Sequence, residues 1–102
     1  MILEIATLTV RDGQTGEFEN TFARASRLIA SIPGYLSLEL QRCLENPNRY
    51  ALLVNWETLE AHTVGFRQSA AYEEWRKTMH PFFDPPVTVE HFRRVELQEI
   101  PG

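Results

Sequence analysis

Hydrophobic residues follow two different periods along the first third of the chain. Residues 2–10 are rich in β-branched residues and end at an Asp-Gly pair, a pattern typical of a strand that enters a turn. From residue 14 to 32 the apolar positions recur at spacings of three and four, which predicts one face of a helix. This face consists of Phe18, Phe22, Ala25, Ile29 and Ile32. Pro33 and Gly34 then predict the end of the helix, because proline cannot continue it and glycine tolerates the reversal.

A β-hairpin is predicted over residues 35–57. Residues 35–45 alternate, an Asn-Pro-Asn turn follows, and residues 50–56 alternate again. One face of the first strand carries Leu36, Leu38, Leu40 and Leu44, and one face of the second carries Tyr50, Leu52, Val54 and Trp56. The opposite face of the second strand carries Ala51, Leu53 and Asn55. Since a strand open to water shows a polar side, we expect this sheet to be covered on both faces.

Residues 58–79 have helical character but are interrupted. Thr58 is a plausible N-cap, Gly65 breaks the pattern, and Ser69 can cap a second segment. We expect His62, which follows the first capping turn, to be exposed. The sequence therefore predicts two short helical pieces rather than one long helix.

The last part of the chain contains an irregular segment and a strand. Residues 80–86 include three prolines, which forbid regular backbone pairing, and residues 87–97 read as a strand. The tail to Gly102 could be loose or could reach onto a partner. The complete order, β-α-β-β-α-β, predicts a single α+β domain over residues 1–102, a ferredoxin-like fold with a four-stranded antiparallel sheet and helices on one face. The second face, if apolar, favours a homodimer in which two sheets stack.

Composition narrows the classes of partner and compartment. The chain has 102 residues, of which 43% are hydrophobic, and its net charge is −4 with both signs dispersed. A nucleic-acid footprint or a membrane-surface segment would need clustered basic residues, so we expect neither partner. No stretch predicts a signal peptide or a membrane span. The single cysteine, Cys43, excludes an internal disulfide and fits a reducing compartment, so we expect a cytoplasmic protein.

Several local strings resemble the antibiotic biosynthesis monooxygenase family. Residues 50–62 match its pattern of a strand, a Trp-Glu-Thr sequence and a helix, and residues 65–76 and 85–92 resemble a bacterial branch of it. Pro33-Gly34-Tyr35 fits the family's usual start of the second strand. The resemblance implies a dimeric α/β barrel with a cavity between sheet and helices. Some members oxidise aromatic polyketides or quinols with molecular oxygen and no metal or flavin, others cleave haem, and others are isomerases.

The candidate site residues are aromatics and a few polar groups, because the chain shows no nucleophile motif, phosphate loop or metal-ligand spacing. A cofactor-free oxygenase needs an apolar pocket, a base and a donor for the developing oxyanion. His91, on the same predicted strand face as Val89, is the candidate base; the alternative is a structural histidine at the barrel seam. Tyr72 could donate to a substrate oxygen, and Arg76 could bind an anionic group or could be a solvated surface residue.

The predicted walls of the pocket are large aromatic side chains. They are Trp56, Phe66, Trp75 and Phe92, each of which could instead simply fill the core. The sequence thus predicts a monooxygenase without cofactor or metal that acts on a small phenol, quinol or polyketide-like molecule. The alternative is a non-catalytic dimer that binds a small apolar metabolite. An open pocket favours chemistry, and a pocket packed solid by aromatics favours the structural reading.

Overall fold

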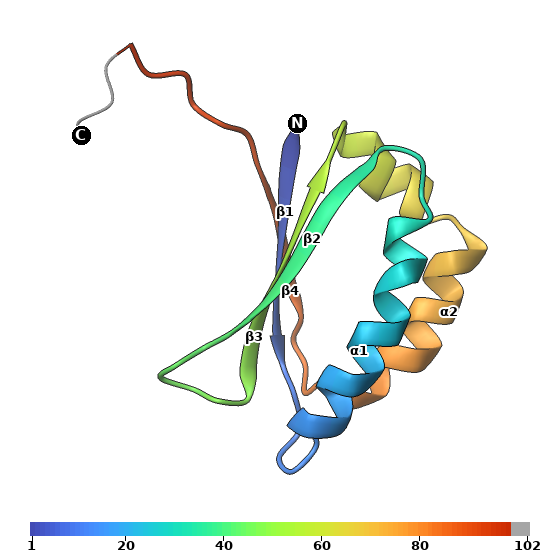
Figure 1. Cartoon of the computed structure of the whole chain (residues 1–102), viewed down its shortest axis with the longest axis vertical. Helices are drawn as coiled ribbons and strands as arrows, with labels where there is room; N and C mark the ends of the chain where they lie inside the picture. Colours follow the sequence, from blue (N-terminus) through green and yellow to red (C-terminus); the bar gives the residue numbers. More distant parts are fainter. Residues whose placement is uncertain (99–102) are drawn as a thin grey trace.

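The computed structural model describes residues 1–98, so the last part of the predicted tail lies outside the described residues. Its elements follow the predicted order (Figure 1). They are β1 (Ile2–Thr9), α1 (Thr15–Ala30), β2 (Tyr35–Arg42), β3 (Arg49–Trp56), η1 (Ala61–Phe66), α2 (Ala70–Met79), η2 (His80–Phe82) and β4 (Thr88–Phe92). The predicted ferredoxin-like α+β fold is confirmed.

The four strands form one antiparallel sheet in the order β2-β3-β1-β4. Both α-helices lie on the same side of this sheet (Figure 1). The turn before β2 depends on Gly34, whose φ of 93° is a left-handed conformation that favours glycine. A side chain there would also collide with Ala61, since a Cβ would lie 2.7 Å from the Ala61 Cβ. The predicted helix stop therefore also sets how closely η1 approaches the sheet.

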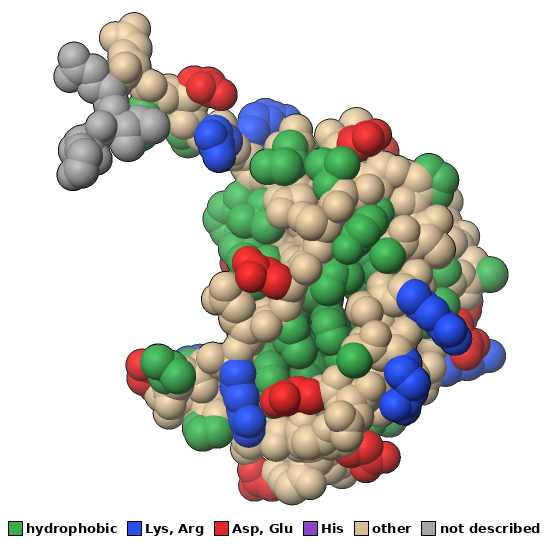
Figure 2. Space-filling view, in the orientation of Figure 1, with side chains coloured by type: hydrophobic (Ala, Val, Ile, Leu, Met, Phe, Trp, Pro, Cys, Tyr) green, Lys and Arg blue, Asp and Glu red, His purple; other side chains and the backbone are tan. Residues whose placement is uncertain are grey.

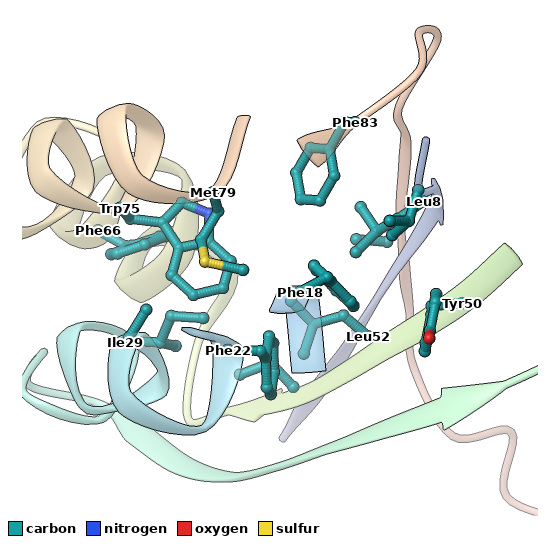
Figure 3. Packing of buried hydrophobic residues seen from close by; sticks show 14 of the residues in the cluster. Leu8, Phe18, Phe22, Ile29, Tyr50, Leu52, Phe66, Trp75, Met79 and Phe83 are labelled. Atoms are coloured by element: carbon teal, nitrogen blue, oxygen red, sulfur yellow. The ribbon is translucent and has the colours of Figure 1, made fainter. Parts of the chain in front are cut away.

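The hydrophobic core lies between the sheet and the helices. Its sheet side is the predicted face of β3, where every second residue from Tyr50 to Trp56 is buried. Its helix side is the predicted stripe of α1, together with Trp75 and Met79 of α2. Figure 3 shows these side chains from the helices and from the strands pointing toward one another. The predicted alternation of β3 is confirmed. The structure adds which face meets the helices, namely the one that carries Tyr50, Leu52, Val54 and Trp56.

The first strand of the hairpin departs from the predicted pattern at its start. A β-bulge between Tyr35 and Ser37 shifts the pairing with β3, so that Leu36 is the extra residue. Tyr35 therefore joins the core side, where its ring packs edge-on against Trp56, and Leu36 is 45% exposed. Leu44 lies in the hairpin loop and is exposed, so the prediction of a common face for all four leucines is wrong.

The last strand is shorter than predicted and ends at Phe92 rather than residue 97. β4 pairs with β1, and Phe92 lies opposite Leu3, which is almost the first residue of that strand. Beyond this point β1 offers hardly any further residues for pairing, so the chain continues as an extended arm away from the domain (Figure 1). Val95 and Leu97 of this arm are exposed.

The interrupted helical region is confirmed and has an unusual first piece. η1 is a single stretch of π-helix, in which the backbone N–H of Arg67 donates to the carbonyl of His62. Thr58 accepts a hydrogen bond from the Ala61 N–H through its hydroxyl, and Ser69 accepts one from the Tyr72 N–H. Both predicted capping residues therefore act as caps. Within residues 1–98, no helix is long and apolar enough to cross a membrane.

Candidate functional site

A cavity of about 230 Å³ lies between the sheet and the helical layer. Figure 2 shows hydrophobic side chains gathered in the hollow between these two layers. The lining is aliphatic and aromatic over most of its surface and polar at a few positions. It consists of Glu4, Ala6, Leu8, Ile29, Leu52, His62, Phe66, Arg67, Tyr72, Trp75, His80, Phe83, Val87 and Val89. A mostly apolar cavity with a few convergent polar groups is typical of a small-molecule site.

The polar end of the cavity is built on Glu4, a carboxyl that β1 places on the core side of the sheet. The residue is only 6% exposed. Its Oε1 accepts a hydrogen bond from the indole Nε1–H of Trp56, at 3.0 Å. Trp56 is completely buried at the end of β3, directly across from the start of β1. Trp56 therefore holds a buried carboxyl in place.

His62 connects this carboxyl to the last strand. Its Nε2 lies 3.5 Å from Glu4 Oε1, and its Nδ1 lies 2.7 Å from Nε2 of His91. The imidazole stacks on the Trp56 indole, with ring centroids 5.5 Å apart and planes tilted by 19°. His62 is 2% exposed, so the prediction that it lies at the surface is wrong. The π-helix turns this residue, together with Phe66, toward the sheet.

Burial favours the neutral forms of the groups at this end of the cavity. It raises the pKa of Glu4, although the hydrogen bond from Trp56 and the charge of Arg67 act in the opposite direction. Burial, assisted by Arg67 and His91, lowers the pKa of His62 to about 4. The pKa of His91 is also lowered, by partial burial and by Arg67. His62 is therefore neutral at pH 7, and its contact with Glu4 is a polar contact rather than an ion pair.

The structure brings three of the predicted site residues to the cavity wall and places the other four elsewhere. Phe66, Tyr72 and Trp75 line the cavity. Trp56 is packed behind it, and His91 reaches it through His62. Arg76 points away and pairs with Glu73 at 3.1 Å, with half of its side chain exposed. Phe92 is 47% exposed and lies on the opposite sheet face, since it follows His91 along an alternating strand.

Sequence reasoning missed three polar residues at the cavity, namely Glu4, His62 and Arg67. One signal was present for Glu4: a charged residue stands alone at an inward position of an otherwise apolar strand. The positions of His62 and Arg67 depend on the π-helix, which a pattern with a period of 3.6 does not reveal. Among the described residues, no group of three or more His, Cys, Asp or Glu side chains is arranged to hold a metal ion.

Comparisons with known proteins agree with this architecture. Residues 1–78 match the antibiotic biosynthesis monooxygenase family. An uncharacterised Bacillus subtilis protein, YczJ, is 45% identical over 93% of this chain and 100% of its own length. The crystal structure of an antibiotic biosynthesis monooxygenase-like protein from Bordetella bronchiseptica is 41% identical, with a TM-score of 0.89 over 93% of this chain and 97% of that chain. SnoaB, a cofactor-independent oxygenase from Streptomyces nogalater, shares the fold with a TM-score of 0.80 at 20% identity over 95% of each chain. The chain therefore belongs to the antibiotic biosynthesis monooxygenase family.

Proposed function

We propose that the protein is a monooxygenase that oxidises a small aromatic molecule, a phenol, quinol or polyketide-like compound, with dioxygen and without a metal or flavin. The observation that carries this proposal is the cavity itself, which joins aromatic walls to the buried pair of Glu4 and His62. Family membership and the description of SnoaB as a cofactor-independent oxygenase support the same reaction class.

The chemistry requires an electron-rich substrate that can lose a proton inside the cavity. The resulting anion donates electrons to dioxygen and forms a carbon–oxygen bond. One oxygen atom stays in the product as a carbonyl, and the other leaves as water with two hydrogens of the substrate, which come from a CH2 group in an anthrone-type ring or from a ring C–H and an O–H in a phenol or quinol. The protein contributes a proton acceptor and walls that exclude water. Tyr72, whose ring lies at the cavity wall beside Phe66, is positioned to donate to a substrate oxygen.

The cavity volume favours a compact substrate. Pockets for drug-sized ligands are typically about 300–1,000 Å³, and this cavity, at about 230 Å³, is smaller. Its polar groups include Glu4 of β1 and His62 of η1, and its apolar walls come from both the strands and the helices. We therefore expect a planar molecule that directs its acidic group toward Glu4 and His62.

The test is oxygen consumption with a panel of anthrones and hydroquinones, combined with a variant that fills the cavity. Ala6 is 4% exposed and lines the cavity, so Ala6→Leu places three extra carbons inside it. We expect wild-type protein to incorporate one atom of labelled dioxygen and Ala6→Leu to lose at least about tenfold in kcat/KM. Ala30→Leu, at an exposed position of α1, is the matched control and should leave kcat/KM unchanged.

The competing function is ligand binding without turnover, which the same cavity could support. Thermal unfolding separates the two, because any ligand that binds the folded state raises Tm by mass action. Stabilisation by panel compounds, with no oxygen consumed, would favour the binding protein. If no panel compound raises Tm and none leads to oxygen consumption, both functions are contradicted.

We further propose that two copies pair through the sheet face that the helices leave uncovered. This face carries the half-buried Leu3, Ile5 and Leu53 and the exposed Phe92. The exposed apolar residues of the C-terminal arm extend from the same end of β4. Soluble proteins rarely leave large apolar patches in water, and a two-fold pairing of sheets would cover this one.

A charge placed on this face should separate the two copies. Leu53→Glu would bury a carboxylate at the centre of the proposed interface, which is costly without a partner. We expect wild-type protein to sediment as a dimer at micromolar concentration and Leu53→Glu as a folded monomer. Leu59→Glu, at an exposed leucine outside the sheet, is the control and should remain dimeric. A wild-type monomer at this concentration would contradict the pairing.

A further inference from the structure

A continuous chain of polar contacts runs from the cavity to the edge of the sheet. Glu4 Oε1 lies 3.5 Å from His62 Nε2, and His62 Nδ1 lies 2.7 Å from His91 Nε2. Glu4 and His91 are directly paired across β1 and β4, so both side chains lie on the same side of the sheet. The chain thus consists of a carboxyl and two imidazoles from three different elements.

The two ends of this chain differ in their surroundings. Glu4 is 6% exposed and lines the cavity. Its contacts with Trp56 and His62 both use Oε1. Oε2 takes part in neither contact, and Glu4 lines the cavity, so we take Oε2 as the oxygen that faces a ligand. His91, by contrast, is half-buried on the edge strand β4 and so can exchange protons with water.

We propose that Glu4, rather than His91, removes the substrate's proton, and that His62 and His91 connect this buried carboxyl to the solvent. The inference rests on the proposed function and assigns its catalytic residue. Glu4 is the catalytic residue because it lines the cavity, and His91 is a positioning residue because it acts through His62.

The proton transfer balances in simple steps. The C–H or O–H bond of the substrate breaks, its electron pair stays on the substrate, and a new O–H bond forms at Glu4 Oε2. The substrate anion then reacts with dioxygen, and the peroxide that forms takes a proton from the solvent, which leaves the substrate's proton on Glu4. Between turnovers the carboxyl turns its protonated oxygen toward His62 Nε2, and Glu4 regains its charge by passing this proton to His62 while His62 Nδ1 gives one to His91 and His91 gives one to water. The 3.5 Å contact must shorten for this step, as catalytic hydrogen bonds often do when a ligand binds.

The electrostatics of the cavity agree with this assignment. A carboxyl with a raised pKa binds a proton more strongly than an exposed one, whereas His62, with a pKa of about 4, holds a proton only in passage. The other charged or titratable groups at the cavity are Arg67, Tyr72 and His80. Arg67 is the cation among them, and its charge favours the substrate anion as well as the ionised form of Glu4.

The first experiment measures turnover in Glu4→Gln, which keeps an oxygen for the Trp56 N–H but cannot take a proton. We expect kcat to fall by about 10²–10⁴-fold and Glu4→Asp to recover part of it. His91→Gln should lower kcat less and should shift the pH profile of kcat, which a purely structural histidine would not do. Glu60→Gln, at an exposed residue outside the cavity, is the matched control and should leave kcat unchanged.

The second experiment needs no turnover and follows the absorbance of a bound nitrophenol. If Glu4 takes the phenol proton, the two groups share one proton over the pH range in which only one of them is ionised, so the fraction of bound phenolate should not depend on pH within that range. In Glu4→Gln the proton must go to the solvent, and the bound fraction should follow pH. Unfolding curves for each variant establish that the compared proteins are folded.

The outcomes separate this inference from the proposed function. An active wild-type enzyme with an equally active Glu4→Gln variant and unchanged nitrophenol spectra would overturn the role of Glu4 alone. An inert wild-type protein that still shows pH-independent phenolate would support proton transfer to Glu4 and overturn the oxygenase. Phenolate that follows pH in the wild type as it does in Glu4→Gln would contradict Glu4 as the base whatever the turnover.

Discussion

Replacement of Trp56 by alanine is expected to lower the free energy of unfolding by about 3–5 kcal/mol, the usual cost of removing a large aromatic side chain from a core. The indole is completely buried and packs against Tyr35, His62 and Phe66. Its removal also takes away the hydrogen bond to Glu4 and leaves a buried carboxyl oxygen without that donor. Urea denaturation at one fixed protein concentration is the appropriate measurement, since a dimer's stability depends on concentration.

Trp56→Phe separates the packing contribution from the hydrogen bond. Phenylalanine fills much of the same space but cannot donate to Glu4, so we expect a loss of about 1–3 kcal/mol, the cost of an unsatisfied buried polar group. A loss below about 1 kcal/mol for Trp56→Ala would mean that the core around the indole collapses readily, and that Trp56 does not hold Glu4 in place.

Stability should also fall as the pH is lowered from about 6.5 to about 4, the interval between the ordinary pKa of histidine and that of His62 in the folded protein. In this interval the unfolded chain binds a proton at this histidine and the folded chain does not, so the free energy of unfolding rises with pH. At about 1.4 kcal/mol per pKa unit, the contribution of His62 is on the order of 3 kcal/mol and is complete above pH 6.5. His80 and His91, whose pKa values are also lowered, act in the same direction.

The contribution of Glu4 has the opposite sign. Its pKa is raised in the folded protein, so the folded state binds more protons than the unfolded state above the ordinary pKa of 4.5, and stability falls as pH rises. Urea unfolding of wild type and His62→Gln between pH 4.5 and pH 7.5 isolates the histidine. We expect a smaller loss of stability in His62→Gln than in wild type as the pH falls. Two parallel curves would show that His62 is not buried in its neutral form.

The arrangement of the elements could be predicted because it depends on local periods. The apolar stripe of α1 and the alternation of β3 are set by residues three, four or two positions apart, and these patterns identify a helix and a strand without any knowledge of their partners. The caps at Thr58 and Ser69 are equally local, since each hydroxyl accepts from an N–H three residues later. The same local information predicted that every second residue from Tyr50 to Trp56 lies on one face of the strand.

The site could be predicted only in part, because it depends on which residues the tertiary structure brings together. The aromatic walls follow from the α2 stripe, and Tyr72 and Trp75 were therefore predicted to lie at the cavity. The placement of Glu4 and His91 on one side of the sheet, in contrast, depends on the register of β1 against β4, in which a shift of one residue would turn a side chain to the other face. The burial of His62 depends on a π-helical turn, and the exposure of Leu36 on a bulge.

The sequence by itself thus determined the order and type of the elements, which residues share a face of α1 and of β3, and the aromatic character of the space between the layers. Only the tertiary structure decided that this space keeps a cavity. It also decided that a carboxyl and two histidines, at least 29 positions apart in the sequence, meet at the polar end of this cavity. The physical reason is that periodicity acts over a few residues, whereas strand register, a bulge and a π-turn are settled by long-range pairing and packing.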